Sequence, residues 1–506
     1  MIGSILTWAV QRRLASIDHF RQHPHEVQQR VFRELLRTAG ATEWGRRYGF
    51  LDAPGPREFA QRVPVSSYEQ LYPALERVLR GEADVLWPGR VLWFAKSSGT
   101  TNARSKFIPV TPESLHESHY RAGRDMTATA TLLYPESRVL AGKTLSLGGT
   151  HAPNPFRPDE KDSRVGDVSA VIMQNLPGWA EYIRTPPLEL ALLDEWEEKI
   201  ERIARHVQGV NVSVLAGVPT WMIVLLRRVT ELAGAANITE VWPNLRLFLH
   251  GAVAFGPYRE LFRQMIPGEQ MGYLEIYNAS EGYFAFQDQP ASEDLLLLLD
   301  HGIYYEFIPA DQFDAENPQT LMLEEVELGR SYALVISTNA GLWRYKIGDT
   351  VRFTSLAPYR IRITGRTKHF LNAFGEEVVI ENTDAAIAAA CRATHTTVQD
   401  YTAAPIYFDA TEASRGGHQW LIEFTHPPQD PQHFTQVLDE TLRQLNSDYD
   451  AKRHRDLALL PPVLTVAPAG TFGRWLARKG KLGGQHKVPR LSNSRELLED
   501  ILQGIA

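Results

Sequence analysis

Hydrophobic residues recur near the N-terminus at the spacing of an amphipathic helix. Val27, Val31, Leu35 and Leu36 are separated by charged residues, so they would share one face of a helix with about 3.6 residues per turn. This spacing predicts helical structure over residues 5–40.

Between residues 90 and 350, short β-branched or aromatic runs alternate with helical stretches. The predicted strands are residues 91–95, 212–216, 245–250 and 273–277. The predicted helices each open with a proline, whose missing N–H costs nothing in a first turn, and they are residues 112–133, 219–233 and 257–265. Such alternation favours an α/β fold in which helices flank buried β-sheets.

Two hairpins and a third strand follow. The first hairpin would join residues 295–299 to 302–307 through the tight-turn sequence Asp300-His301-Gly302, and the second would join 334–338 to 343–347. A strand over residues 360–364 then ends at Gly365-Arg366.

The pattern then changes to α+β. Its predicted elements are a helix at 382–391, strands at 401–408 and 419–425, and a helix at 431–447. We therefore expect a large N-terminal domain over residues 1–365 and a smaller, mobile α+β C-terminal domain over residues 366–506.

Composition narrows the class of protein. The chain has 506 residues, 43% of them hydrophobic and 22% charged, which provides ample material for more than one core. A net charge of −7 argues against a general nucleic-acid binder. Cys391 is the sole cysteine, which excludes an intramolecular disulfide and fits a reducing cytosol. The longest apolar run, residues 212–226, is shorter than the roughly 20 residues of a membrane span, so we expect neither a membrane segment nor a signal peptide.

A segment rich in hydroxyl groups follows the first of these strands. Its residues are Ser97, Ser98, Gly99, Thr100 and Thr101, and Lys106 closes it. Small residues let backbone N–H groups crowd around an oxyanion, while hydroxyls add donors and a lysine adds positive charge, as a triphosphate requires. The alternative is an ordinary polar surface turn. The order of glycine, lysine and hydroxyl is not that of a Walker A loop, and neither a zinc-protease nor a nucleophile-elbow motif occurs.

Three further segments are candidates for binding or chemistry. Tyr277-Asn278-Ala279-Ser280-Glu281 combines an aromatic ring, a hydroxyl and a carboxylate, which could stack a base, touch a phosphate and hold Mg²⁺. Asp349, in a predicted hairpin turn, could accept hydrogen bonds from both ribose hydroxyls. Residues 473–490 form a glycine-rich basic tail that could bring a lysine to a reacting phosphate. Each has a plainer alternative: a strand exit, an aspartate that satisfies its own turn, and a solvated loop.

In this order and spacing, the segments resemble the Gretchen Hagen family of acyl-acid amido synthetases, the auxin-responsive proteins of plants that also occur in bacteria, within the acyl-adenylate-forming, firefly-luciferase-like superfamily. The first three segments are similar to its nucleotide motifs, Gly365-Arg366-Thr367-Lys368 resembles its hinge, and residues 484–490, with Lys487, resemble its lysine loop. Ala252 stands where a glycine is common. The chain, compact and with a short hinge, is similar to bacterial members rather than plant ones.

The resemblance implies ATP and Mg²⁺ as cofactors and an activity. A small carboxylic acid, aryl or auxin-like, would be adenylated and its acyl group passed to an amino acid. It also implies the following roles: Lys487 and Glu281 in catalysis, Glu281 on the metal, Trp221 and Val218 at the acyl group, and Ser97, Ser98, Gly99, Thr100, Thr101, Lys106, Gly251, Ala252, Tyr277, Ser280, Asp349 and Arg366 at the nucleotide. No nucleic acid, membrane or stable protein partner is implied.

Three alternatives remain at this point. The acyl group could go to coenzyme A instead of an amine, or the chain could be a ligand-binding relative without chemistry. Trp221 could simply pack in the core, as large aromatic side chains commonly do.

Overall fold

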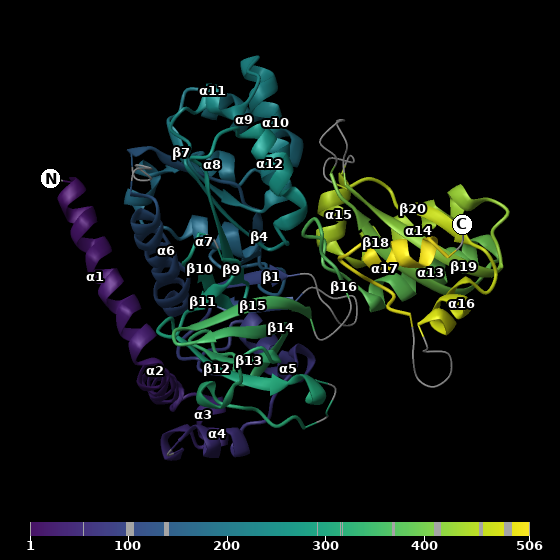
Figure 1. The fold of residues 1–506 in the computed structure, drawn as a ribbon. Helices are drawn as coiled ribbons and strands as arrows, with labels where there is room; N and C mark the ends of the chain where they lie inside the picture. Colours follow the sequence, from purple (N-terminus) through teal and green to yellow (C-terminus); the bar gives the residue numbers. More distant parts are fainter. Residues whose placement is uncertain are drawn as a thin grey trace.

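The computed structural model describes residues 2–53, 55–97, 106–135, 141–290, 292–313, 315, 317–366, 370–408, 416–454, 459–479 and 488–504. These residues form a large N-terminal domain and a smaller C-terminal domain, drawn in yellow and green at the right of Figure 1. The α/β fold class expected from the sequence is confirmed.

The large domain is built around one long mixed sheet. Within the described residues its 11 strands lie, in spatial order, as β12 (Ile303–Pro309), β13 (Ser331–Thr338), β14 (Tyr345–Leu356), β15 (Tyr359–Arg366), β11 (Leu295–Leu297), β10 (Gly282–Gln287), β9 (Gly272–Ala279), β8 (Leu247–Gly251), β7 (Val212–Gly217), β3 (Lys143–Ser146) and β6 (Arg184–Thr185). The strands from β9 to β6 are parallel, and those from β12 to β9 are antiparallel.

A second sheet of four strands accompanies it. Its order is β2 (Lys106–Val110), β1 (Trp93–Ser97), β5 (Arg164–Gly166) and β4 (His151–Pro153). The helices of the large domain are α1 (Ile2–Gln22), α2 (Pro24–Ala39), α3 (Glu43–Tyr48), α4 (Pro56–Arg62), α5 (Tyr68–Leu79), α6 (Tyr120–Leu133), α7 (Val168–Gln174), α8 (Leu188–Ala191), α9 (Trp196–Val207), α10 (Pro219–Ala233), α11 (Ile238–Val241) and α12 (Arg259–Met265). Figure 1 shows α1 along the outer edge of the domain beside α6.

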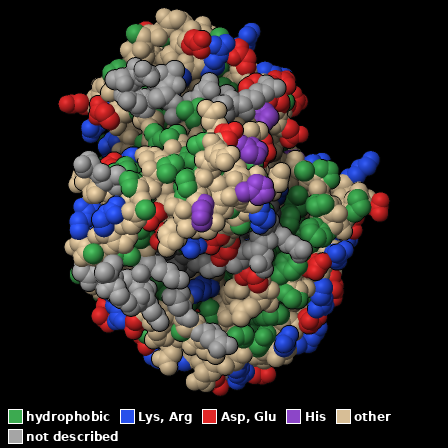
Figure 2. All heavy atoms as spheres, turned by 90° about the vertical axis from the view of Figure 1, so that its right-hand side faces the viewer, with side chains coloured by type: hydrophobic (Ala, Val, Ile, Leu, Met, Phe, Trp, Pro, Cys, Tyr) green, Lys and Arg blue, Asp and Glu red, His purple; other side chains and the backbone are tan. Residues whose placement is uncertain are grey.

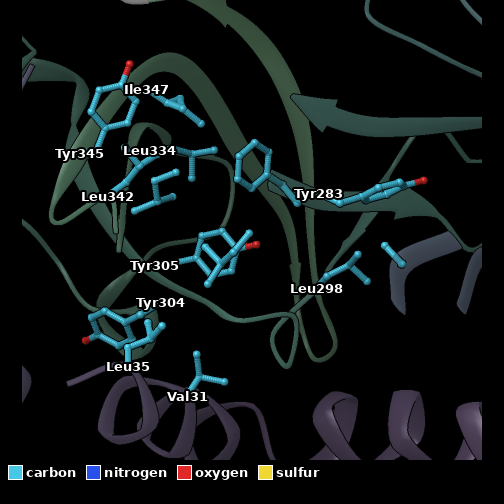
Figure 3. Packing of buried hydrophobic residues seen from close by; sticks show 14 of the residues in the cluster. Val31, Leu35, Tyr283, Leu298, Tyr304, Tyr305, Leu334, Leu342, Tyr345 and Ile347 are labelled. Atoms are coloured by element: carbon cyan, nitrogen blue, oxygen red, sulfur yellow. The ribbon is translucent and has the colours of Figure 1, made fainter. Parts of the chain in front are cut away.

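The amphipathic spacing near the N-terminus produces the helix that it predicts. Val31 and Leu35 of α2 are buried and point toward Tyr304 and Tyr305 of β12 (Figure 3). The buried Gln28 of the same helix donates from its amide to the Leu299 carbonyl at 2.8 Å. This helix therefore covers the antiparallel end of the central sheet.

Local sequence also explains where several helices begin and end. Pro219 lies in the first turn of α10, and Gly234 ends that helix in the left-handed conformation, which glycine adopts without strain. Ser67 and Gln70 form a reciprocal capping box at the start of α5. The predicted strand at 212–216 and helix at 219–233 are thus confirmed.

The first predicted hairpin is wrong. Strand β11 pairs with β10 and β15, whereas β12 lies at the far edge of the sheet and pairs with β13. A turn sequence specifies that the chain changes direction, but not which strand becomes its neighbour. Here the corner residues Asp300 and His301 are held by charged side chains of α1 and α6, such as Arg13 and Asp125. The second predicted hairpin, β13 with β14, and the strand after it are confirmed.

Two predicted details also change. The helix over 112–133 contains a π-helical segment, Ser114–His119, before α6 begins. Asp349 lies within β14 rather than in a hairpin turn, because Gly348, with φ of +99°, allows the strand to bulge against β13 and continue.

The C-terminal domain has its own two small sheets. Its elements are β16 (Phe370–Leu371), β17 (Val378–Val379), α13 (Ile380–Thr394), β18 (Thr397–Ile406), β19 (Gly417–His426), α14 (Pro431–Leu445), α15 (Ser447–Arg453), β20 (Val463–Ala467), α16 (Thr471–Arg478) and α17 (Glu496–Leu502). The three-stranded sheet runs β18-β19-β20, with β16 and β17 paired separately. The predicted α+β pattern is confirmed. The boundary at 365/366 and the mobility of this domain stay predictions.

The face of the molecule drawn in Figure 2 does not favour one charge. On the face shown in Figure 2, acidic and basic side chains of the described residues are interspersed. None of the helices in the described part of the chain combines the length and the apolar character that a bilayer crossing requires.

Candidate functional site

The first predicted nucleotide motif joins two paired strands. Ser97, the last residue of β1, lies opposite Lys106, the first residue of β2, in an antiparallel ladder. Lys106 is buried, and its ammonium lies 5.8 Å from the centroid of the Tyr68 ring. The segment between them contains the predicted Ser98, Gly99, Thr100 and Thr101, which lie outside the described residues. The structure therefore places the two ends of the motif side by side.

Tyr68, at the start of α5, lies beside this motif. Its hydroxyl accepts a hydrogen bond from the Phe107 N–H at 2.8 Å. Burial raises the pKa of this hydroxyl, and the negative charge of Glu281 adds to the rise, which places Glu281 in electrostatic range of Tyr68. Sequence analysis missed Tyr68, because its only local signal was the capping box that starts the helix.

The second motif forms the tip of a tight β-hairpin. Ala279 of β9 lies opposite Gly282 of β10, so Ser280 and Glu281 make the turn between them. Both turn residues are half-buried. The motif predicted as the end of a strand is thus a hairpin that presents a hydroxyl and a carboxylate together.

The third motif contacts the second directly. The Tyr277 hydroxyl donates a hydrogen bond to the Asp349 carboxylate at 2.5 Å, and both side chains are less than a tenth exposed. The Tyr277 ring is tilted against Phe284, with 4.9 Å between ring centroids. Asp349 lies opposite Arg366 in the β14–β15 ladder, although the Arg366 side chain is outside the described part of the structure. The fold thus unites residues 72 positions apart in the chain.

Gly251 and Ala252 lie at the end of the neighbouring strand β8. Gly251 pairs with Ile276, and a Cβ at Gly251 would collide with the Ile276 carbonyl oxygen, which explains the glycine there. Ala252 adopts the left-handed conformation, with φ of +71°, where a side chain is strained. Its carbonyl accepts a hydrogen bond from the Asn372 amide of the C-terminal domain at 2.9 Å. Gly251 and Ala252 therefore lie one strand away from Tyr277, which belongs to β9.

The two residues predicted to line the acyl group lie at the start of α10. Val218 precedes the helix and is half-buried. The Trp221 ring lies 5.1 Å from the Trp196 ring, and the buried Lys452 ammonium of the C-terminal domain lies 4.1 Å from the Trp221 centroid. Trp221 thus takes part in the contact between the two domains, and its acyl role stays a prediction.

Lys487 lies outside the described residues, but the residues that follow it are anchored. The Pro489 carbonyl accepts a hydrogen bond from the Thr402 hydroxyl at 2.8 Å, and the Arg490 carbonyl accepts from the Ala403 N–H at 2.9 Å. The Arg490 guanidinium pairs with Asp384 at 2.5 Å. The predicted lysine loop is therefore fixed at its C-terminal end on β18 and α13.

A buried charge cluster lies where α6 meets the turn between β11 and β12. Asp125, Asp300 and His301 bring possible metal ligands within 4.8 Å of one another. Arg13 donates to both oxygens of Asp125 at 2.5 and 2.7 Å, and Arg121 donates to the Asp300 carbonyl at 2.6 Å. Guanidinium groups already compensate these carboxylates, so we interpret the cluster as the anchor of α1.

Known proteins of similar sequence and fold match nearly the whole chain. The indole-3-acetic acid-amido synthetase GH3.3 of Arabidopsis thaliana is 24% identical over 96% of this chain and 93% of its own. A solved structure of the GH3.15 acyl acid amido synthetase has a TM-score of 0.60 at 18% identity, covering 97% of this chain and 95% of that one. A 2-hydroxyisobutyryl-CoA ligase has a TM-score of 0.53 at 12% identity, covering 96% and 92%.

Three domain families match consecutive parts of the chain. Residues 13–271 match the GH3 family N-terminal domain, residues 296–366 the GH3 family central domain, and residues 381–496 the GH3 family C-terminal domain. The first of these matches alone spans more than half of the chain. The chain belongs to the GH3 family.

Proposed function

We propose that this protein is an ATP-dependent acyl-acid amido synthetase. It adenylates a small carboxylic acid, aryl or auxin-like, and transfers the acyl group to the amine of an amino acid, releasing pyrophosphate and AMP. Membership in the GH3 family supports this proposal, as do relatives named indole-3-acetic acid-amido synthetases.

The observation that most supports the proposal is the hydrogen bond between Tyr277 and Asp349. An aromatic ring and a carboxylate that lie in contact can flank a base and accept hydrogen bonds from the ribose hydroxyls. The paired residues Ser97 and Lys106 bring a hydroxyl and an ammonium to the loop expected to hold the phosphates.

We assign the remaining roles as follows. Ser97, Ser98, Gly99, Thr100, Thr101 and Lys106 bind the phosphates, Ser280 binds the α-phosphate, Gly251 and Ala252 border the adenine, Tyr277 flanks it, Asp349 and Arg366 hold the ribose, and Trp221 and Val218 line the acyl group. Lys487 counters the charge that develops in the adenylation step.

The chemistry follows from the weakness of a carboxylate as an electrophile. An oxygen of the acid attacks the α-phosphorus, and pyrophosphate leaves. The amine nitrogen then attacks the acyl carbon, loses a proton, and AMP leaves. Holding the mixed anhydride beside the amine can remove up to about 7–11 kcal/mol of the barrier in well-oriented systems, and closure of the domains would exclude water.

The Glu281 carboxylate fits the preference of Mg²⁺ for hard oxygen ligands. It lies at a hairpin tip, half-buried and in electrostatic range of Tyr68. We propose that Glu281 holds Mg²⁺, which neutralises phosphate charge when bound.

Exchange of radioactive pyrophosphate into ATP tests the proposal. We expect exchange that depends on an added acid, in a panel that includes indole-3-acetate and benzoates. Product analysis with amino acids and with coenzyme A then separates an amide from a thioester. If none of the acids in a broad panel supports exchange, the result would favour a ligand-binding relative without chemistry.

Lys487→Ala tests the lysine loop. We expect loss of adenylation with little change in ATP affinity, because the lysine would act on charge that develops only in the transition state. Exchange rates and ATP binding by calorimetry measure the two effects, and Lys481→Ala in the same basic tail is the matched control. Equal loss of binding and turnover in Lys487→Ala would assign this lysine to ground-state binding.

We also propose that residues 1–365 and 366–506 are the two domains, that the second is mobile, and that the protein is a cytoplasmic, bacterial-type member of its family.

A further inference from the structure

The π-helical segment Ser114–His119 supports the hairpin of the second motif at two adjacent positions. The Ser118 hydroxyl accepts a hydrogen bond from the Tyr283 N–H at 3.1 Å. Nδ1 of His119 lies 3.1 Å from Oδ1 of Asn278. Asn278 and Tyr283 face each other across the hairpin, so the segment holds both of its strands.

The widened turn is what brings consecutive residues into contact with the hairpin. The Tyr120 N–H bonds to the Leu115 carbonyl, five residues earlier, which is the π-helical pattern. The π-helix is rare and appears mostly as single turns inside α-helices, frequently at functional sites. Here the distortion places His119 against Asn278, inside the motif that we assign to the nucleotide.

His119 is neutral in this position. The side chain is 5% exposed, and this burial lowers its pKa to about 4 although the hydrogen bond to Asn278 opposes the shift. A neutral imidazole carries one N–H, and the Asn278 oxygen can only accept. The proton therefore lies on Nδ1, and since the Asn278 amide accepts it through Oδ1, the contact leaves the N–H groups of that amide for other acceptors.

The Asn278 side chain leaves β9 on the face opposite to Tyr277, since successive side chains of a strand alternate. Tyr277 meets Asp349, whereas Asn278 meets the helical segment that precedes α6. Asn278 as a whole is half-buried.

We propose that His119 is a positioning residue that fixes Asn278, so that the Asn278 amide nitrogen donates a hydrogen bond to the carboxylate of the acyl acid. The inference rests on the proposed function, and it deepens it by naming the group that orients the acid. Asn278 is the residue that touches the substrate, and His119 acts through it.

Steady-state exchange kinetics with three variants test this proposal. His119→Leu removes the donor, and we expect the KM of the acid to rise about fivefold to tenfold, the range of one hydrogen bond, with an unchanged KM of ATP. His119→Asn places an amide N–H near the position of Nδ1 and should keep the KM of the acid close to wild type. The matched control is His116→Leu, on the exposed side of the same segment, which should change neither constant.

A double-mutant cycle identifies the route of the effect. In an Asn278→Ala background, His119→Leu should add nothing to the KM of the acid. An additional rise there would overturn the proposal, and so would an equal rise in both KM values together with a lower melting temperature. Loss of kcat in His119→Asn would also overturn it, because it would indicate proton transfer by the ring.

The ring tautomer provides a readout that does not depend on turnover. Nitrogen-15 NMR of the wild-type protein should show a neutral His119 ring protonated on Nδ1 at pH 7. A ring protonated on Nε2 overturns the inference even where exchange is active. If the wild-type protein shows no exchange with any acid, this result counts against the proposed function and not against the contact. The tautomer of His119 still decides whether its ring donates to Asn278.

Discussion

At the scale of single residues, the buried contact between Tyr277 and Asp349 should dominate nucleotide binding. Removing one partner of a hydrogen bond to a charged group costs about 1.5–3 kcal/mol, so we expect Tyr277→Phe to raise the KM of ATP about tenfold or more. Pyrophosphate exchange at varied ATP measures this effect.

The matched control is Tyr305→Phe. The Tyr305 hydroxyl is buried and finds no hydrogen-bond partner in the described part of the chain, so its removal should leave the KM of ATP unchanged. An equal KM of ATP in Tyr277→Phe and wild type would mean that the contact with Asp349 does not shape the nucleotide site.

Gly251 and Ala252 are adjacent residues, and the backbone favours glycine at both positions. A non-glycine residue in the left-handed conformation is strained by about 1 kcal/mol or more, so Ala252→Gly should raise the free energy of unfolding by about 0.5–1 kcal/mol. Gly251→Ala should lower it by more, because the added Cβ would meet the Ile276 carbonyl. Urea unfolding compares the two, and a destabilised Ala252→Gly would contradict the assigned strain.

At the scale of elements, sequence patterns predicted the helices and strands themselves better than they predicted which of them become neighbours. The helices at α2 and α10, the strands β7 and β8, and the hairpin of β13 with β14 follow from periodicity and from proline and glycine placement. The partners of β11 could not be predicted in this way. Asp300 and His301, which follow β11, form contacts with α1 and α6, and these contacts depend on residues far away in the chain. The π-helical turn was equally hidden, since its residues have ordinary helical spacing.

The charge cluster that anchors α1 should make stability depend on pH. Burial lowers the pKa of His301, but pairing with Asp300 at 2.8 Å and with Asp125 outweighs it, so that the pKa is raised above the usual value of about 6.5. A raised pKa in the folded state contributes stability that is fully present below pH 6.5 and is lost as the pH rises through the folded-state value.

We therefore expect wild-type stability to fall above neutral pH by more than that of His301→Gln. Unfolding free energies from urea titrations at pH 6 and pH 9 measure the difference, with the exposed His433→Gln as control. A parallel pH dependence in wild type and His301→Gln would mean that this ring does not titrate with folding.

At the scale of the whole molecule, three hydrogen bonds between described residues hold the start of the C-terminal domain on the large domain. Thr220 donates to the Phe374 carbonyl at 3.3 Å, Tyr258 donates to the Ala373 carbonyl, and Asn372 donates to the Ala252 carbonyl. These contacts lie beside the strand end that we assign to adenine, so nucleotide binding and domain position should be coupled.

The double variant Thr220→Val, Tyr258→Phe tests how far these contacts set the arrangement in Figure 1. Each lost hydrogen bond costs about 1 kcal/mol, and we expect a larger radius of gyration by small-angle X-ray scattering. Thr383→Val, which loses a hydrogen bond to Tyr401 within the C-terminal domain, should not change it. An unchanged radius of gyration in the double variant would mean that other contacts keep the two domains together, for example that of Lys452 with Trp221.

The sequence by itself determined the α/β class, the order of the motifs and the resemblance to the GH3 family, because these depend on residues close together in the chain. Only the tertiary structure decided that Tyr277 binds Asp349, 72 residues away, and that His119 meets Asn278, 159 residues away. The physical reason is that such contacts follow from the order of strands in the sheet and from one distorted helical turn. Short-range hydrophobic periodicity specifies elements, but it does not specify which elements become neighbours.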